Sequence, residues 1–254
     1  MVLPPATKGN LMRELLQPIK SESLVEVFIQ RFEKLILSGK ISIGQKLPSE
    51  RELAFQLGIS RPVVHEGLLD LETKGLVTMV PRVGTFVNDY RKEGSLELLN
   101  SLVHYHEGNL APGLFESLLS MRAHFEIEFA RLAALNRTEE HLTEIKTLLA
   151  EETAADPEHT EKITEFDFRF HHLIALASGN LVYPLLLNSF KEVYTNLTSQ
   201  FFRDISVVSM VFSLHQKLYP ALEQHNPKGA EKIMKEIISH GESHLRSLIV
   251  QRQN

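Results

Sequence analysis

Cysteine is absent from all 254 residues of this sequence. Its absence excludes disulfides, thiolate metal sites and cysteine nucleophiles, and we expect a protein of the reducing cytoplasm. The sequence also lacks any run of about 18 apolar residues, so we expect no membrane-spanning helix. Its amino end has no basic start followed by an apolar block, and we therefore expect no secretory signal.

An excess of basic residues is lacking as well. The 27 Lys and Arg side chains are outnumbered by 32 Asp and Glu side chains, which gives a net charge of −5. A chain of this charge has no general attraction for polyanions, so any contact with DNA must come from a local surface. The hydrophobic fraction of 43% is sufficient for a packed core in one large or two ordinary domains.

Residues 47–87 carry a dense set of local structure signals. Ser49 with a glutamate three residues later is a capping box, which starts a helix. Gly58 permits a left-handed turn, and Ser60 is a good N-cap for a second helix that ends at Gly75. This order of cap, turn and cap predicts a helix-turn-helix, whose second helix enters the major groove of DNA.

Two short β-type runs follow the helix pair. Residues 76–80 and 84–87 predict a hairpin wing, and apolar side chains at helical spacing in residues 21–38 predict a preceding helix. We therefore assign residues 21–88 to a winged helix-turn-helix domain, residues 1–20 to a flexible arm and residues 89–94 to a linker.

The strings LPSERELAFQLGISRPVVHEGL and GLVTMVPRVGTFV resemble the DNA-binding domain of the GntR family of bacterial transcription regulators. The sequence departs from that family at His65, where arginine is usual, and a neutral imidazole binds a base or phosphate more weakly than a guanidinium does. The residues that the resemblance assigns to DNA contacts are Arg51, Ser60, Arg61, Val63, His65 and Arg82.

From residue 95 onward the pattern changes, because no period-2 alternation remains and every long segment has helical spacing. The fold class we predict is mainly α, with an all-α antiparallel bundle of six or seven helices over residues 95–254 for effector binding and dimerisation. We expect helices at about 95–108, 112–135, 138–154, 159–178, 181–203, 206–225 and 228–251.

A candidate metal site lies in this helical region. Asp167 and His171 are four residues apart and project from one face of their helix, and His215 lies on a later helix. A carboxylate with two or three imidazoles from separate helices can hold a divalent ion such as Zn, Ni or Mn. His240 or His244 of the last helix is the candidate fourth ligand. The alternative is that these histidines cap helices or lie at the surface.

The helical region resembles the ligand-binding domain of the FadR subfamily, on Met121-Arg122, Asp167-x-x-Phe170-His171, Ala177 to Asn180 and His215. The resemblance implies that a metal ion and Arg122 bind a small carboxylate. It would place the fourth metal ligand near Ile237, one turn before His240. The sequence of residues 95–122 also resembles the fatty acyl-CoA-sensing branch of this subfamily. That resemblance implies that Arg122, Tyr194 and Ser243 line an acyl-CoA site.

These features predict a cytoplasmic, homodimeric transcription regulator whose two heads bind a pseudo-palindromic double-stranded DNA operator. A small acidic metabolite, either a carboxylate or an acyl-CoA, would control operator affinity from the helical region. A metal-dependent hydrolase that uses the His/Asp cluster is the alternative. It lacks a His-Glu-x-x-His motif and leaves the winged helix unexplained, so we expect no enzyme. A purely structural metal ion is a third possibility.

Overall fold

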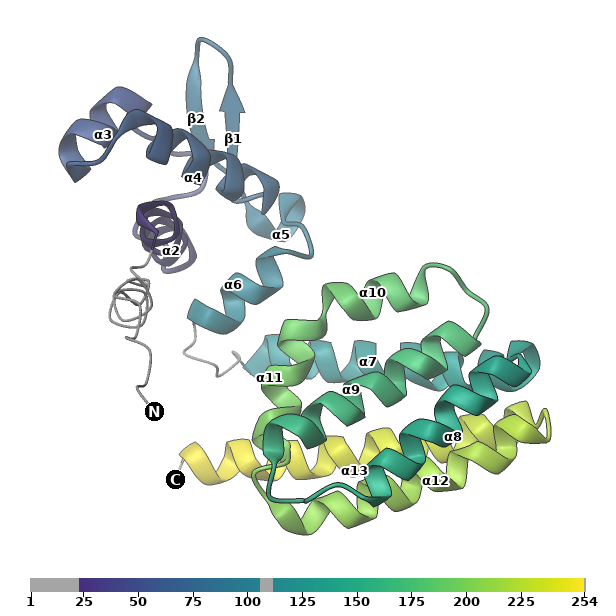
Figure 1. The fold of residues 1–254 in the computed structure, drawn as a ribbon. Coiled ribbons are helices and arrows are strands. Elements are labelled where there is room, and N and C mark those ends of the chain that lie inside the picture. Colours follow the sequence, from purple (N-terminus) through teal and green to yellow (C-terminus); the bar gives the residue numbers. More distant parts are fainter. Residues whose placement is uncertain (1–22, 106–111, 254) are drawn as a thin grey trace, which may run out of the picture. The chain divides into compact units, whose positions relative to one another are not determined.

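The computed structural model describes residues 23–105 and 112–253, so the arm predicted for residues 1–20 lies outside the described residues. The chain divides into two compact units, Met1–Gly94 and Ser95–Asn254. We call the described part of the first unit the head and that of the second the helical unit (Figure 1). No helix among the described residues is long and apolar enough to cross a membrane.

The head is a winged helix-turn-helix. Ser49 caps its middle helix and exchanges hydrogen bonds with Glu52, and Gly58 ends that helix with a φ of 67°. The hairpin pairs Val77 with Val87 in antiparallel register. The elements are α2 (Leu24–Leu37), α3 (Glu50–Leu57), α4 (Arg61–Thr73), β1 (Val77–Val80), β2 (Gly84–Val87) and α5 (Tyr90–Glu93).

The core of the head lies between α2 and α4. Phe28 and Phe32 of α2 stack at 4.4 Å between ring centroids and are buried against α4. Gly67 of α4 is needed for this contact, because a Cβ there would lie 2.3 Å from the Phe28 ring. Leu68 and Leu71 complete the buried face of α4. The apolar spacing of these helices thus orients α4 with its amino end exposed.

The segment predicted as a plain linker, residues 89–94, contains the short helix α5. The Asp89 side chain caps it by accepting a hydrogen bond from the backbone N–H of Arg91. The segment folds back onto Gly75, where a Cβ would lie only 2.0 Å from the carbonyl oxygen of Glu93. Gly75 therefore serves both the end of α4, with a φ of 75°, and the close approach of α5.

The helical unit is an all-α bundle. Its long helix α7 packs against α13 and α9, and α12 packs against α13 and α8. Fully buried Phe129, Phe170, Phe202 and Leu218 form the centre of its core. The helices are α6 (Leu98–Tyr105), α7 (Pro112–Asn136), α8 (Glu139–Thr153), α9 (Thr160–Ala177), α10 (Tyr183–Ser189), α11 (Lys191–Phe201), α12 (Val208–Glu223) and α13 (Pro227–Gln253), with a 3₁₀ turn η1 (Ile205–Val207) before α12.

One predicted helix is two. The segment 181–203 breaks at Phe190, whose φ of −96° and ψ of 1° lie outside the helical range. Neither glycine nor proline marks this break in the sequence. The Phe190 side chain is buried with Leu118 and Val193, so tertiary packing accounts for the turn. The break separates α10 from α11, and both helices then face α7 across a cavity.

Candidate nucleic-acid interface and buried ligand site

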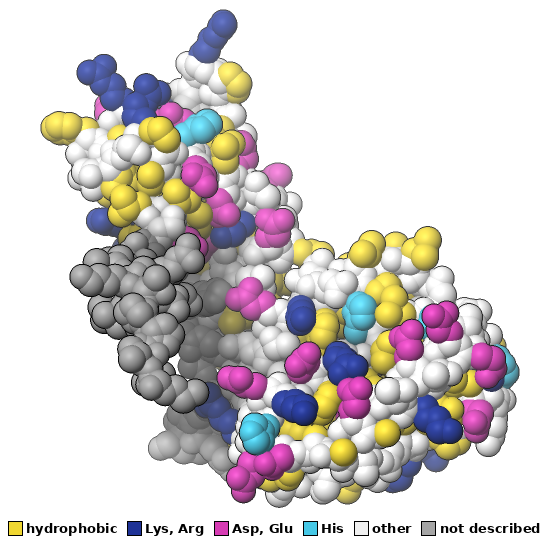
Figure 2. All heavy atoms as spheres, in the orientation of Figure 1, with side chains coloured by type: hydrophobic (Ala, Val, Ile, Leu, Met, Phe, Trp, Pro, Cys, Tyr) yellow, Lys and Arg dark blue, Asp and Glu magenta, His cyan; other side chains and the backbone are white. Residues whose placement is uncertain are grey.

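The residues predicted to contact DNA lie at the exposed starts of α3 and α4 and at the wing. Arg51 is exposed in the first turn of α3, and the Arg61 side chain retains 65% of its exposure at the start of α4. The hydroxyl of Ser60 makes no capping hydrogen bond, and Val63 is half-buried. Figure 2 shows Lys and Arg side chains gathered over this end of the head and at the wing tip. This surface is locally basic although the chain is not.

The wing presents Arg82 at its tip. Arg82 is exposed and has a φ of 63°, in the turn closed by the hydrogen bond from the Val83 N–H to the Val80 carbonyl. Gly84, two residues later, lies against the side chain of Lys46, so that a Cβ on Gly84 would lie 2.5 Å from the lysine Cε. A second cation therefore lies beside the base of the turn that carries Arg82.

Glu50 is a residue of this surface that we did not predict. Its carboxylate lies 2.7 Å from Nδ1 of His65 and accepts a hydrogen bond of 3.4 Å from Nη2 of Arg61. The hydrogen bond with His65, followed by that from Arg61, lowers the pKa of Glu50 below its usual value despite partial burial. Glu50 thus holds the two α4 side chains from the first turn of α3. We call this arrangement the Glu50 clasp.

The three metal-ligand candidates of the helical unit meet in its core. Asp167 and His171 of α9 and His215 of α12 each offer an atom within 4.8 Å of the others, and all three side chains are buried. The Nε2 atoms of His171 and His215 lie 3.9 Å and 3.7 Å from Oδ1 of Asp167. Two imidazoles therefore direct the same ring nitrogen at one carboxylate oxygen.

Two further carboxylates contact the other ring nitrogen, Nδ1, of these imidazoles. Glu126 of α7 contacts Nδ1 of His171, and Oε1 of Glu152 of α8 lies 2.9 Å from Nδ1 of His215. Burial raises the pKa of Glu126, but its interactions with Arg122 and then His171 outweigh burial and lower that pKa to about 2. Both glutamates were missed, because a glutamate on a helix usually lies on an exposed face.

Arg122 of α7 and Tyr194 of α11 extend this group of histidines and carboxylates to α11. The Arg122 Nε donates to Oε1 of Glu126 at 2.5 Å, and its Nη2 donates to the Tyr194 hydroxyl at 2.9 Å. The Tyr194 hydroxyl in turn donates to Oδ2 of Asp167 at 2.6 Å. Burial chiefly raises the pKa of Tyr194, so the phenol stays protonated as a donor. We call Arg122, Glu126, Glu152, Asp167, His171, Tyr194 and His215 the polar centre.

Two of the predicted site residues lie elsewhere. His240 of α13 is not part of the His/Asp group and stands beside the Phe201 ring, with centroids 6.0 Å apart. Ser243 is exposed, and its hydroxyl donates to the Ser239 carbonyl of its own helix. Ile237 instead lies beside Asp167, along a small cavity, at the position where the resemblance places a fourth ligand. His240 and Ser243 lie further along α13 than Ile237, so neither occupies that position.

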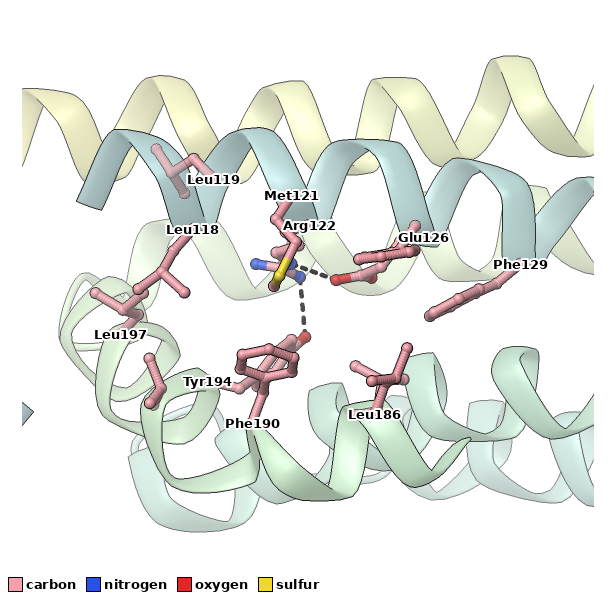
Figure 3. Close-up of a pocket in the computed structure, with 13 residues that line it drawn as sticks. Leu118, Leu119, Met121, Arg122, Glu126, Phe129, Leu186, Phe190, Tyr194 and Leu197 are labelled. Atoms are coloured by element: carbon pink, nitrogen blue, oxygen red, sulfur yellow. Dashed lines mark hydrogen bonds and ion pairs between the residues drawn. The ribbon is translucent and has the colours of Figure 1, made fainter. Parts of the chain in front are cut away.

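An apolar cavity of about 50 Å³ lies between α7, α10 and α11. Figure 3 shows its leucine and phenylalanine side chains on both sides of Arg122 and Tyr194. Arg122 also lines the small cavity of about 20 Å³ beside Asp167. The larger cavity is lined by Leu118, Leu119, Met121, Arg122, Phe125, Glu126, Phe129, Leu186, Leu187, Phe190, Val193, Tyr194 and Leu197.

Comparisons with known proteins cover both units. Residues 13–87 match the bacterial regulatory proteins of the gntR family, and residues 88–248 match the FadR C-terminal domain. The HTH-type transcriptional regulator Mce2R of Mycobacterium tuberculosis is 31% identical over 92% of this chain and 97% of its own. The fatty acid metabolism regulator protein of Proteus mirabilis is 28% identical over 88% of this chain and 90% of its own.

A solved structure has the same fold. The structure of Lar, which controls expression of the agr system of Listeria monocytogenes, has a TM-score of 0.59 and 15% identity over 90% of this chain and 99% of its own. The similarity extends over both units of the chain and concerns the fold alone at this level of identity.

Proposed function

The chain belongs to the gntR family of bacterial regulatory proteins, with a FadR C-terminal domain, and we propose that a small acidic metabolite bound at its polar centre controls its affinity for an operator. It is a transcription regulator, since its family and the relatives that match along most of its length are regulators rather than enzymes. The observation that supports metabolite control is the buried His/Asp group beside Arg122.

The head would engage DNA through the start of α4. The exposed Arg61 and His65 would reach base edges in the major groove, and Arg51 and Arg82 would contact the backbone on either side. A homodimer would present two such heads to the two halves of a pseudo-palindromic operator.

The polar centre fits a divalent ion by charge and by geometry. With neutral imidazoles it contains one positive group, Arg122, and three negative groups, Glu126, Glu152 and Asp167, a net formal charge of −2. Asp167, His171 and His215 would hold Zn, Ni or Mn, while Glu126 and Glu152 fix the imidazoles by their Nδ1 contacts. The buried Nε2 of His215 has no hydrogen-bond partner among the described residues, as expected of a ligand atom.

A bound metal ion would supply a Lewis-acidic anchor for a carboxylate. Around it, Arg122 would bind the effector carboxylate, and the Tyr194 hydroxyl would keep Asp167 oriented. The effector can change operator affinity only by the difference between its affinities for two conformations of the protein. A fatty acyl-CoA is a second candidate effector, favoured by the apolar cavity and by the name of the Proteus mirabilis relative.

Titration of a fluorescent duplex from the chain's own upstream DNA tests this proposal. We expect specific binding at moderate salt and at least a fivefold change in affinity when a carboxylate effector is added to the metal-loaded protein. His171→Ala should lose the bound metal and the effector response but keep operator binding. His240→Ala is the matched control and should keep all three.

Two results would contradict the proposal. Absence of specific binding at moderate salt would exclude operator recognition by this head. Retention of metal in the His171→Ala protein would place the ion elsewhere. A chelator that lowers the melting temperature, with no carboxylate that raises it again, would indicate a purely structural ion.

A further inference from the structure

The polar centre and the apolar cavity share side chains. Arg122 lines both the apolar cavity and the small cavity beside Asp167. Tyr194 lines the apolar cavity with its ring and donates its hydroxyl to Asp167. Figure 3 shows Arg122 between the leucines of the cavity and the carboxylate of Glu126. A ligand bound to Arg122 would therefore have the polar centre on one side and apolar walls on the other.

Arg122 retains a donor for such a ligand. Its hydrogen bonds to described residues use Nε, toward Glu126, and Nη2, toward the Tyr194 hydroxyl and Nε2 of His171. Nη1 donates to none of the described residues, although a guanidinium offers five N–H donors and pairs well with carboxylates. Binding a carboxylate at Nη1 leaves the ion pair with Glu126 intact, so the polar centre need not be dismantled.

The walls of the cavity select against a polar tail. Leu118, Phe125, Leu186 and Leu197 contribute to them, and the polar members of the lining are Arg122, Glu126 and Tyr194, with apolar side chains on both sides of them. A dicarboxylic or polyhydroxy acid would place a second polar group against leucine and phenylalanine, which costs free energy because no partner is there. An acyl thioester would bring an uncharged carbonyl to the guanidinium in place of a carboxylate.

We propose that the effector is an unesterified straight-chain monocarboxylic acid. Its carboxylate binds Arg122 beside the Asp167–His171–His215 group, and its alkyl chain occupies the cavity between α7, α10 and α11. This inference rests on the proposed function, since it names the chemical class of the effector at the same site. It unites the two ligand classes that the sequence suggests separately.

A chain-length series on the full, zinc-loaded protein tests the inference by calorimetry. The probes are acetate, butyrate, hexanoate, octanoate and decanoate, with methyl octanoate and octanoyl-CoA as esterified counterparts. Each buried methylene should tighten binding about fourfold until the cavity is filled. Octanoate should bind at least tenfold more tightly than either esterified probe. Equal affinity for acetate and octanoate, or preference for octanoyl-CoA, would overturn the inference.

A matched pair of variants locates the tail. Leu186 lines the cavity, whereas its neighbour Leu185 is 63% exposed and does not. Leu186→Phe should weaken octanoate binding about tenfold or more and leave acetate within twofold, because it removes space for the tail alone. Leu185→Phe should leave both unchanged. Equal effects of the two substitutions would place the tail outside this cavity.

Failure of the inference can be told apart from failure of the proposed function. If acids bind with an affinity independent of length while metal content and operator binding are intact, only the tail assignment fails. If no acid binds to protein that retains zinc and binds the operator, carboxylate control fails as well. The series on the wild-type chain decides this even if Leu186→Phe does not fold.

Discussion

The head and the helical unit use the same kinds of charged side chain in opposite surroundings. In the Glu50 clasp the Arg61 and His65 side chains are 65% and 53% exposed. In the polar centre the His171, His215 and Glu126 side chains are between 0% and 2% exposed. Exposed pairs contribute about 0–1 kcal/mol, whereas a buried charge that loses its partner costs several kcal/mol. The exposed pairs of the clasp therefore contribute little to stability, whereas the buried pairs of the polar centre are needed for it.

The clasp joins only α3 and α4, and it leaves its cations in water where a phosphate can reach them. The polar centre joins five helices, because its members come from α7, α8, α9, α11 and α12. A ligand or metal at the polar centre therefore acts on the packing of most of the helical unit. A change in the clasp alters the binding surface and little else.

The largest difference between the two regions should appear on removing one partner of the buried pairs. Glu126→Ala leaves Arg122 and His171 without their carboxylate and should lower the free energy of unfolding of the helical unit by about 3–5 kcal/mol. Glu128→Ala, three residues from the exposed Arg131, is the control and should cost about 0–1 kcal/mol. Urea unfolding followed by circular dichroism measures both. Equal costs would show that burial of the Glu126 pairs does not increase their contribution to stability.

The second largest effect should be a loss of stability of the helical unit as the pH is lowered. The pKa of Glu126 is lowered to about 2 in the folded protein from an ordinary value of 4.5. Its contribution to stability is therefore complete above pH 4.5 and is lost as the pH falls toward 2, on the order of 3 kcal/mol in all. Glu126→Gln should flatten the stability profile over this range, measured against Glu128→Gln. Parallel profiles for the two variants would show that Glu126 is not ionised by its partners.

Local signals in the sequence were sufficient for the helix-turn-helix and the wing of the head, but not for α5. The capping box at Ser49, the left-handed Gly58 and the glycine of the wing each act within a few residues, so α3, α4 and the hairpin follow from the sequence alone. Glu50 was missed because its partners lie on the next helix. A side chain that caps nothing and faces outward gives no local sign that it is paired.

In the helical unit, contacts between segments distant in the sequence decide which side chains form the site. Asp167 and His171 share a helical face by their spacing, and they lie together. Glu126 and Glu152 are buried against histidines of other helices, so they could be found only through those partners. His240 was selected by residue type, but the Ile237 position of α13 faces the site. The break at Phe190 likewise depends on packing against other helices.

A smaller effect is expected at the exposed cations of the head. Arg61→Ala should weaken specific operator binding by about 1–3 kcal/mol, roughly 5- to 150-fold, because it removes a side chain at the start of α4. The melting temperature should stay unchanged, in contrast to the Glu126 variants. Arg31→Ala, exposed on α2, is the matched control and should affect neither. Fluorescence anisotropy at fixed salt measures the affinities. A loss of stability without a loss of binding would make Arg61 a structural residue.

The smallest effect should come from Glu50→Gln, which changes the clasp without removing a cation. Its carboxylate orients Arg61 and His65 but also repels phosphates, so the two consequences oppose each other. Nonspecific DNA binding should rise, and the ratio of specific to nonspecific affinity should fall about two- to fivefold, the amount that an exposed pair can contribute. Glu66→Gln, exposed on α4, changes the charge equally without touching the clasp. If both variants alter the ratio alike, charge alone acts on DNA binding, and the orienting role of Glu50 is excluded.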